Sequence, residues 1–131
     1  MNTREVVIIG GGPAGLAAAA ALKKAGVDDI LIVEREKQLG GILRQCIHDG
    51  FGLTRFKETL SGPEYSQRFI DEVKSLGIDF ITNATVIDLS HDKGVTVDSR
   101  GGLLEIRANA VILTMGWRGR ARGALAIPGT R

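Results

Sequence analysis

A glycine pattern close to the amino terminus constrains the fold more than any other feature of the sequence. It is preceded by Val6–Ile9, four consecutive large aliphatic residues, which is typical of a parallel strand buried on both faces. Gly10, Gly12 and Gly15 then fit the pattern G-x-G-x-x-G. A strand that ends in this turn and leads into a helix is a common arrangement for binding a dinucleotide.

The residues that follow complete a strand–helix–strand unit. The stretch 16–22 consists of leucine and alanine, which favour a helix. A second aliphatic run, Ile30–Val33, predicts the next parallel strand. It is followed by Glu34, about 20 residues after the last glycine of the pattern, where the dinucleotide-binding fingerprint has an acid. An ordinary βαβ unit with a glycine-rich turn is the alternative, and it leaves the acid and its spacing unexplained.

Each residue of the pattern has a physical role in this interpretation. Gly10 allows the tight turn out of the strand, Gly12 allows the backbone to approach a pyrophosphate, and Gly15 allows the helix to lie close to the sheet. The first helical amides have no partner inside the helix, so they tolerate Pro13 and favour an anion. Glu34 is expected to accept hydrogen bonds from the hydroxyls of an adenosine ribose and to repel a 2′-phosphate.

The middle of the chain predicts a loop and then a second helix–strand crossover. Residues 35–59 show no clear period, and a loop of this length in a compact domain is usually functional or disordered. A helix is predicted after Gly62-Pro63, with Gly77 at its end, followed by a strand at 78–82. The apolar stripe of this helix, which we expect to pack in the core, comprises Tyr65, Phe69, Val73 and Leu76.

The carboxyl-terminal part of the chain has a different pattern. The runs 84–89, 94–98 and 103–108 alternate partly and are separated by polar and glycine-containing turns, so we predict a three-stranded antiparallel β-meander. Ala110–Leu113 returns to the pattern of a buried strand and ends in Thr114-Met115-Gly116. The predicted fold is therefore α/β and Rossmann-like, a parallel sheet with helices in which the meander forms a crossover.

Bulk properties exclude several classes of function. A chain of 131 residues is one domain's worth, and a net charge of +2 is too small to argue for a nucleic-acid or membrane surface as partner. A single cysteine provides neither a disulfide framework nor a C-x-x-C metal site, so no metal is expected. The longest apolar stretch is interrupted by glycines, a proline and lysines, so we predict no membrane span and a cytoplasmic location by default.

Together these motifs resemble the FAD-binding half of the flavoproteins with two dinucleotide-binding domains, a superfamily that includes glutathione reductase and thioredoxin reductase. The resemblance covers nearly the whole chain and rests on the glycine pattern, Glu34, the Gly40-Gly41 loop, the meander and Thr114-Met115-Gly116. The segments 40–52 and 60–65 are most similar to a branch of FAD-dependent NAD(P)/FAD oxidoreductases that often accompany anaerobic glycerol-3-phosphate dehydrogenases.

The resemblance implies an FAD/NAD(P)-binding fold that holds FAD, with NAD(P)H as co-substrate of the intact enzyme. It implies that Arg35 lies along the adenine and that the backbone near Val86 touches the adenine edge. The Gly40-Gly41 loop would approach the ribityl chain and the isoalloxazine. The implied cofactor-binding residues are Gly10, Gly12, Pro13, Ala14, Gly15, Glu34, Arg35, Gly40, Gly41, Val86, Thr114 and Gly116.

The sequence departs from the superfamily in three respects. The disulfide reductases carry two cysteines soon after this loop, whereas this chain has only Cys46, so dithiol exchange within the chain is excluded. Trp117 stands where the branch usually has a cysteine. Members run to several hundred residues, so we expect 1–116 to be an incomplete amino-terminal segment of the FAD-binding domain and 117–131 a linker toward an NAD(P)-binding domain.

The sequence assigns no catalytic residue. Cys46 is either a thiolate near the flavin or a structural cysteine, since no adjacent cation clearly lowers its pKa. His48 and Asp49 form either a proton relay or an ordinary surface pair. The arginines between Arg118 and Arg131 either clamp a phosphate or belong to a solvated linker.

The leading hypothesis is the FAD-binding portion of a flavin-dependent NAD(P)H oxidoreductase that passes a hydride or electrons through the flavin to an unknown acceptor. This chain alone is not expected to be catalytically complete. One alternative is a fragment of an NAD-dependent dehydrogenase, because Glu34 suits NAD equally well. Another is a non-catalytic nucleotide-binding subunit that a partner chain or a second copy completes, for which an exposed sheet edge would be the structural sign.

Overall fold

The computed structural model describes residues 2–41 and 62–115. Within these ranges six strands form one sheet, in the order β3-β2-β1-β6-β5-β4, together with two α-helices. The elements are β1 (Asn2–Ile9), α1 (Pro13–Lys24), β2 (Ile30–Val33), α2 (Gly62–Ser75), β3 (Asp79–Ile81), β4 (Thr85–Leu89), β5 (Gly94–Ser99) and β6 (Gly102–Leu113). The predicted α/β, Rossmann-like architecture is confirmed.

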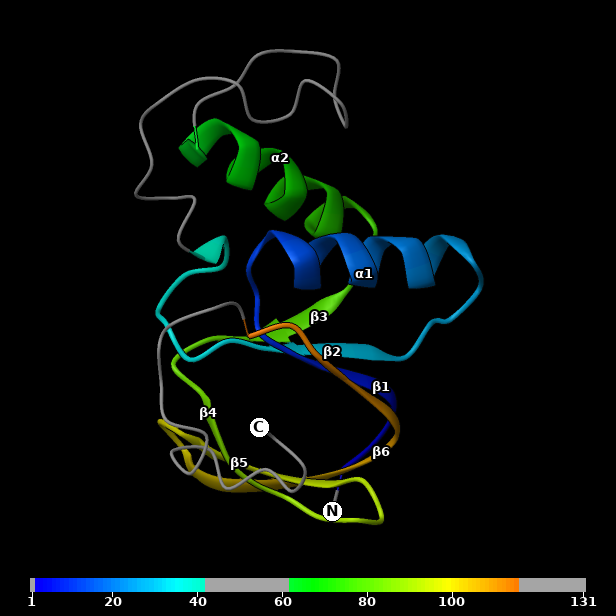
Figure 1. Ribbon diagram of the computed structural model, residues 1–131, viewed down its shortest axis with the longest axis vertical. Coiled ribbons are helices and arrows are strands. Elements are labelled where there is room, and N and C mark those ends of the chain that lie inside the picture. Colours follow the sequence, from blue (N-terminus) through cyan, green and yellow to red (C-terminus); the bar gives the residue numbers. More distant parts are fainter. Residues whose placement is uncertain (1, 42–61, 116–131) are drawn as a thin grey trace.

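The parallel half of the sheet consists of β3, β2, β1 and the second half of β6. β1 pairs in parallel with β2 on one side and with β6 on the other, and β2 pairs in parallel with β3. Both helices cover one face of this half (Figure 1). Val6, Ile8 and Ile32 point toward them and form a core with Leu16 of α1 and Val73 of α2. This is why Val6–Ile9 of β1 and Ile30–Val33 of β2 form continuous aliphatic runs: these residues are buried on both faces of the sheet.

The predicted stripe of α2 packs as expected. Phe69 and Val73 are buried in the core between helix and sheet, and Tyr65 and Leu76 pack partly buried against it. The Tyr65 and Phe69 rings, one helical turn apart, meet edge to face with their centroids 5.0 Å apart. Gly77 follows the helix with a φ of +70°, the left-handed conformation that glycine adopts without strain and that ends many helices.

The meander is confirmed, but its last strand is not separate from the strand that follows. The sequence predicts 103–108 and Ala110–Leu113 as two strands, whereas the structure has one continuous strand, β6, from Gly102 to Leu113. Its first half pairs antiparallel with β5 up to Arg107, and its whole second half pairs with β1. Residues 103–113 contain no glycine or proline that would interrupt the strand, so it bends instead of breaking.

Because β6 bends, the antiparallel half of the sheet folds back under the parallel half (Figure 1). A second core fills the space between the two halves, with Val7 and Val33 from the parallel strands facing Val86, Val95 and Val97 from the meander. The parallel strands are therefore covered by helices on one face and by the meander on the other. This arrangement leaves the carboxyl ends of β1, β2 and β6 together at one edge of the molecule.

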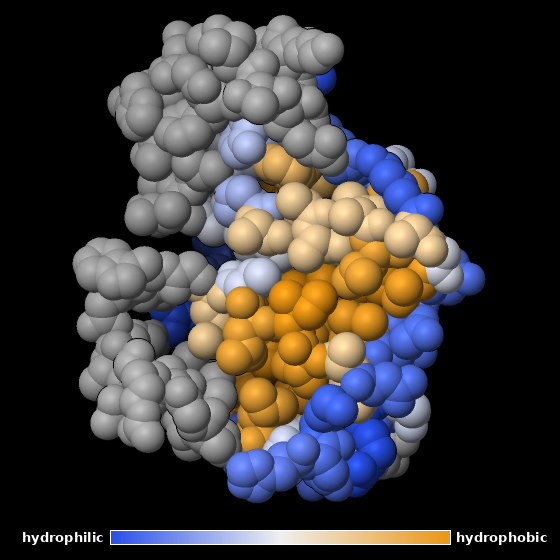
Figure 2. All heavy atoms as spheres, turned by 45° about the vertical axis from the view of Figure 1, so that its right-hand side comes forward, coloured by the Kyte–Doolittle hydropathy of each residue, from blue (hydrophilic) through white to orange (hydrophobic). Residues whose placement is uncertain are grey.

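Apolar side chains also gather on the surface, on the face shown in Figure 2. Among the described residues, the large apolar side chains that are exposed are Ile87, Leu103 and Leu113. From Ala110 to Leu113, β6 pairs with β1, and no other described strand pairs with its second edge. No helix within residues 2–41 and 62–115 is long and apolar enough to cross a membrane.

Candidate functional site

The candidate site is built around the turn between β1 and α1. Gly10 opens the turn with a φ of +115°, and its amide donates to the carbonyl of Val33 at the end of β2, at 2.9 Å. A Cβ on Gly10 would lie 2.3 Å from the carbonyl oxygen of Thr114. Both the backbone conformation and the passage of the chain after β6 therefore require glycine here, as the sequence predicts for a tight turn.

Gly15 allows α1 to lie against the end of β1. A Cβ at this position would lie 2.0 Å from the carbonyl oxygen of Gly10 and 2.7 Å from Oγ1 of Thr114. The close approach of helix and strand predicted for Gly15 is therefore confirmed. It also depends on Thr114, which the glycine pattern by itself does not include.

The amino terminus of α1 is suited to an anion. Gly12 is the N-cap in an extended conformation, Pro13 is the first helical residue, and no acidic side chain occupies the first turn. Among the described residues, a Cβ on Gly12 would meet only the Cα of Gly41, at 3.8 Å, so this part of the structure leaves the backbone open to close approach. The amides of the first turn, including that of Ala14, have no partner within the helix, and they carry the positive end of its dipole. A pyrophosphate fits this arrangement.

Glu34 lies just after β2 with its side chain buried. Its Oε1 accepts a hydrogen bond from the amide of Gly11 and its Oε2 from the amide of Glu36, both at 2.7 Å. The carboxylate therefore ties the glycine turn to the loop that follows β2. A carboxylate has about four lone-pair directions, so each oxygen still has capacity for a further donor such as a ribose hydroxyl.

The Gly40-Gly41 segment lies directly against the glycine turn. The amide of Gly40 donates to the carbonyl of Gly11 at 2.7 Å, and the carbonyl of Gly40 accepts from the hydroxyl of Ser66 on α2 at 3.1 Å. Gly41 has a φ of +64°, and a Cβ there would lie 3.0 Å from the Cα of Gly12. The structure thus brings the two glycine motifs together, whereas the predicted approach of Gly40 and Gly41 to the flavin end of the cofactor stays a prediction.

Thr114 holds the end of β6 to the end of β1. Its amide donates to the carbonyl of Ile9 at 2.9 Å, and its hydroxyl lies 3.2 Å from the carbonyl oxygen of Ile9 and 3.1 Å from that of Gly10. The residue therefore fixes the carbonyl groups at the point where the chain leaves the strand. Its contribution here is to the shape of the turn.

The adenine side of the predicted site is formed by the start of β4. The amide of Ala84 donates to the carbonyl of Glu34 at 3.0 Å, which places β4 beside the residues that follow β2. Val86 lies two residues further on, and its side chain is buried in the second core. The side chain of Val86 is therefore not available to an adenine ring, and the predicted contact of the backbone near Val86 with the adenine edge stays a prediction. Arg35 follows Glu34 and is half-buried.

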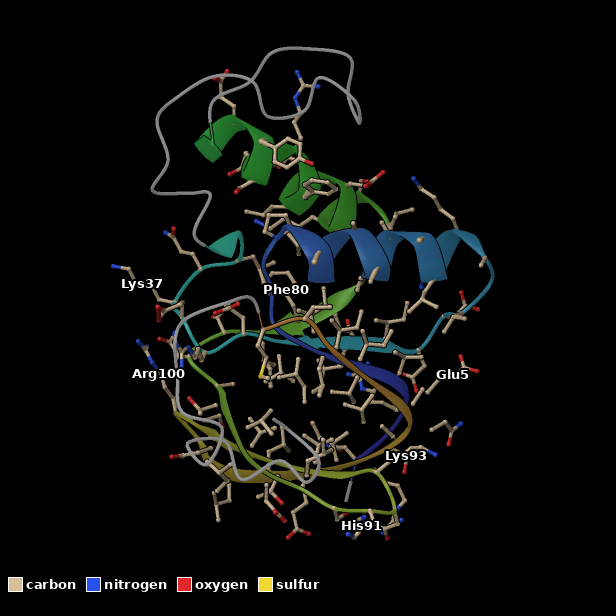
Figure 3. The ribbon with its side chains drawn as sticks, viewed as in Figure 1. Glu5, Lys37, Phe80, His91, Lys93 and Arg100 are labelled. Atoms are coloured by element: carbon tan, nitrogen blue, oxygen red, sulfur yellow. The ribbon has the colours of Figure 1, made fainter. Side chains whose placement is uncertain are left out.

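Figure 3 shows where several exposed basic side chains lie relative to the ends of the parallel strands. Lys37 and Arg100 extend from the side of the molecule on which β1 and β2 end, whereas His91 and Lys93 lie on the turn between β4 and β5, away from that side (Figure 3). Residues 2–41 and 62–115 contain no group of three or more His, Cys, Asp or Glu side chains placed to hold a metal ion.

Three residues of the site were not predicted from the sequence. Gly11 occupies a variable position of the pattern, yet its Cβ would lie 2.6 Å from the Cδ2 of Leu39. Leu39 itself is buried, and Ser66 is fully buried. The sequence does contain a signal for Gly11, because a third glycine between Gly10 and Gly12 indicates that this position also has no room for a side chain. Leu39 and Ser66 lack such a signal, because each is a single residue in a stretch that the sequence assigns to a loop or to packing.

Several predicted features lie outside the described residues. These are Gly116, Cys46, His48 and Asp49, the greater part of the 35–59 loop, and the linker 117–131. They stay predictions. The described part of the site therefore comprises the glycine turn, Glu34, the Gly40-Gly41 segment and Thr114.

The sequence of this chain is similar to those of several known proteins. The sequence profile of the pyridine nucleotide-disulphide oxidoreductases matches residues 4–130. The chain is 34% identical over 94 residues to the glutamate synthase [NADPH] small chain of Mycobacterium tuberculosis, covering 71% of this chain and 17% of the relative. It is 32% identical over 123 residues to the thioredoxin reductase of Streptomyces clavuligerus, covering 93% of this chain and 37% of the relative.

Solved structures show a similar fold. The atypical thioredoxin reductase TRi from Desulfovibrio vulgaris Hildenborough matches with a TM-score of 0.66 and 27% identity, over 91% of this chain and 38% of that chain. The structure of BexE matches with a TM-score of 0.76 and 23% identity, over 98% of this chain and 35% of that chain, and this likeness shows the fold alone. The chain thus spans well under half the length of these relatives.

Proposed function

Since this chain belongs to the pyridine nucleotide-disulphide oxidoreductase family, we propose that it is the FAD-binding part of a flavin-dependent oxidoreductase. The observation that carries the proposal is the assembly at the amino terminus of α1. There Gly12 leaves the backbone open, Glu34 presents a carboxylate beside the turn, and Gly41 lies against Gly12. A dinucleotide needs these three features together: an anion site, a ribose acceptor and a close backbone surface beyond the phosphates.

In this proposal different residues bind different parts of the cofactor. The amides of the first turn of α1, including Ala14 and Gly15, would hold the pyrophosphate, and Glu34 would accept from the ribose hydroxyls. Arg35 and the backbone near Val86 would border the adenine. Gly40 and Gly41 would approach the cofactor on its flavin side, and Thr114 and Gly116 would pass close to the cofactor where the chain leaves the domain. When bound, FAD would supply hydride or electron transfer between NAD(P)H and an acceptor, and the chain's own residues position it.

We further propose that 1–116 is an incomplete amino-terminal segment of the FAD-binding domain and 117–131 a linker toward an NAD(P)-binding domain. Two observations support this. The chain covers only 37% of the length of the thioredoxin reductase relative, and no described strand pairs with the second edge of β6 from Ala110 to Leu113. The branch that accompanies anaerobic glycerol-3-phosphate dehydrogenases remains our proposal for its place in the family, on the segments 40–52 and 60–65.

A second candidate is a nucleotide-binding subunit without catalysis of its own, completed by a partner chain. The second edge of β6 from Ala110 to Leu113 favours it, because no described strand pairs with this edge and its backbone groups can accept another strand. The glutamate synthase relative is itself named a small chain, which also supports a partner subunit. Size-exclusion chromatography with and without FAD separates this candidate from a monomeric fragment.

The first experiment is the visible absorption spectrum of the freshly purified protein, followed by denaturation to release and identify any nucleotide. A bound flavin supports the proposal directly, whereas bound NAD would favour the dehydrogenase alternative. If the protein is colourless, titrations with FAD and ADP follow. Because the described contacts lie mainly on the adenine and pyrophosphate side, we expect affinity for ADP to be retained better than the additional affinity for the flavin end. A chain that binds neither ligand contradicts the proposal.

Gly12→Ala provides a matched test of the site. Gly12 has a φ of −80°, which any residue adopts, and its Cβ would make only an ordinary contact with Gly41. The variant is therefore expected to fold with nearly unchanged stability. The added methyl group would stand where the pyrophosphate approaches, so we expect affinity for both FAD and ADP to fall about tenfold or more. Unchanged affinity would show that the ligand binds elsewhere.

A further inference from the structure

Two polar side chains are buried within the described part of the chain, and both bond to the backbone of the same site. Glu34 accepts from the amide of Gly11, and Ser66 donates to the carbonyl of Gly40. A buried hydroxyl is costly unless it is hydrogen-bonded. Ser66 is fully buried and points across to a residue 26 positions away in the sequence. Its bond to Gly40 therefore needs an explanation beyond helix formation.

With the bond from Ser66, both backbone polar groups of Gly40 are hydrogen-bonded. Its amide is held by the carbonyl of Gly11 and its carbonyl by the hydroxyl of Ser66. Gly40 and Gly41 both have positive φ, at +116° and +64°, and without side chains they have more accessible conformations than other residues. The two hydrogen bonds select one of these conformations and hold it against the glycine turn.

The direction of the Gly40–Gly41 peptide follows from the same bond. In a trans peptide the C=O and the following N–H point in opposite directions. Since the carbonyl of Gly40 points to Ser66, the amide of Gly41 points away from α2. Gly41 lies beside Gly12, at the amino terminus of α1. The hydroxyl of Ser66 thus fixes the direction in which the amide of Gly41, a hydrogen-bond donor just beyond the glycine turn, points.

The position of Ser66 is itself fixed by the core. Phe69, Ile70 and Val73 anchor α2 against the sheet, so the hydroxyl is presented from a rigid element. We propose that Ser66 is a positioning residue of the dinucleotide site, which orients the Gly40-Gly41 segment for the ribityl and flavin end of the cofactor. This inference rests on the proposed function and names a residue that acts on the ligand through another part of the chain.

The test compares Ser66→Ala with wild type in titrations with FAD and with ADP. Ser66→Ala removes one oxygen atom and leaves the helix intact. We expect affinity for FAD to fall about three- to tenfold, the size of one hydrogen bond's net contribution, while affinity for ADP changes less than about twofold. A purely structural role would change both affinities by the same factor, so the ratio of the two is the decisive readout.

Ser75→Ala is the matched control, because Ser75 lies on the same helix and its hydroxyl also bonds to a backbone carbonyl, that of Glu72, at 2.9 Å but in an exposed position. This variant is expected to bind both ligands like wild type. Thermal denaturation without ligand shows that each variant is folded. Equal FAD affinity in Ser66→Ala and wild type overturns the inference and leaves the proposed function standing. A wild-type chain that binds neither ligand overturns both.

Discussion

Replacing Glu34 by glutamine tests whether this carboxylate organises the turn in the absence of any ligand. In the structure both of its oxygens accept backbone amides, from Gly11 and from Glu36, at 2.7 Å each. A glutamine side chain of the same shape offers one acceptor oxygen and one NH₂ group, which only donates. In Glu34→Gln one of the two amides therefore faces a donor and loses its acceptor.

The size of the effect follows from these two bonds. A hydrogen bond to a charged group contributes about 1.5–3 kcal/mol net, and a buried amide left without an acceptor costs about 1–3 kcal/mol. These two energies describe overlapping losses, so they are not added in full. The hydrogen bond that remains also becomes weaker, because its acceptor in glutamine is neutral. We therefore expect Glu34→Gln to lower the free energy of unfolding by about 3 kcal/mol, a large part of the roughly 5–15 kcal/mol of a typical domain.

The assay is urea denaturation of the ligand-free chain, followed by circular dichroism. With an m-value of about 2 kcal/mol per M, the midpoint is expected to fall by about 1.5 M while the m-value stays unchanged. Glu105→Gln is the control, since Glu105 is exposed on β6 and its substitution is expected to change stability by less than about 0.5 kcal/mol. If both variants unfold at the wild-type midpoint, Glu34 does not hold the turn and the reasoning is refuted.

Three further perturbations address other contacts. Gly15→Ala is expected to lower the free energy of unfolding by about 2 kcal/mol, because overpacking against a backbone oxygen outweighs the gain in helix propensity; an unchanged urea midpoint would contradict this. Thr114→Val removes the hydroxyl that two carbonyl groups share, and we expect it to lower the free energy of unfolding by about 1 kcal/mol in the same urea assay. An unchanged midpoint would show that this hydroxyl does not stabilise the turn. The hydroxyl of Ser90 and the guanidinium of Arg107 lower the pKa of Asp92 from 3.8 to about 2. The depressed pKa means that the associated stability is present above pH 3.8 and is lost as the pH falls toward 2. An NMR titration of Asp92 should therefore give a midpoint near 2 in wild type and closer to 3.8 in Ser90→Ala, and equal midpoints would refute the assignment.

The sequence was sufficient for the elements whose signals are local. Val6–Ile9 lies within β1, and Ile30–Val33 coincides with β2, because a strand buried on both faces needs an unbroken aliphatic run. The roles of Gly10 and Gly15 in the turn were also predictable, since backbone conformation and close packing restrict both positions to glycine.

What the sequence did not predict depends on contacts between distant segments. The carboxylate of Glu34 was expected to bind a ligand, but that it also accepts from Gly11 depends on the path of the chain after β2, which has no periodicity. Ser66 lies in a helix whose amphipathic pattern assigns faces but does not say which small polar residue bonds to a loop. The continuity of β6 depends on two partners: β5, which directly precedes it and pairs with its first half, and β1, which lies at the amino terminus and pairs with its second half.

The pairing of β1 with β6 has a consequence for how the protein is made. The hydroxyl of Thr114 secures the carbonyl of Gly10 across 104 positions of the sequence, and a contact of such separation requires a long chain segment to close before it forms. At a synthesis rate of about 5–20 residues per second, Thr114 follows Gly10 out of the ribosome by roughly 5–20 s. During that interval β1, α1 and β2 exist without the strand that closes the glycine turn. The ligand-binding geometry is therefore acquired at the end of translation of this segment, although the residues that signal it are the first to be made.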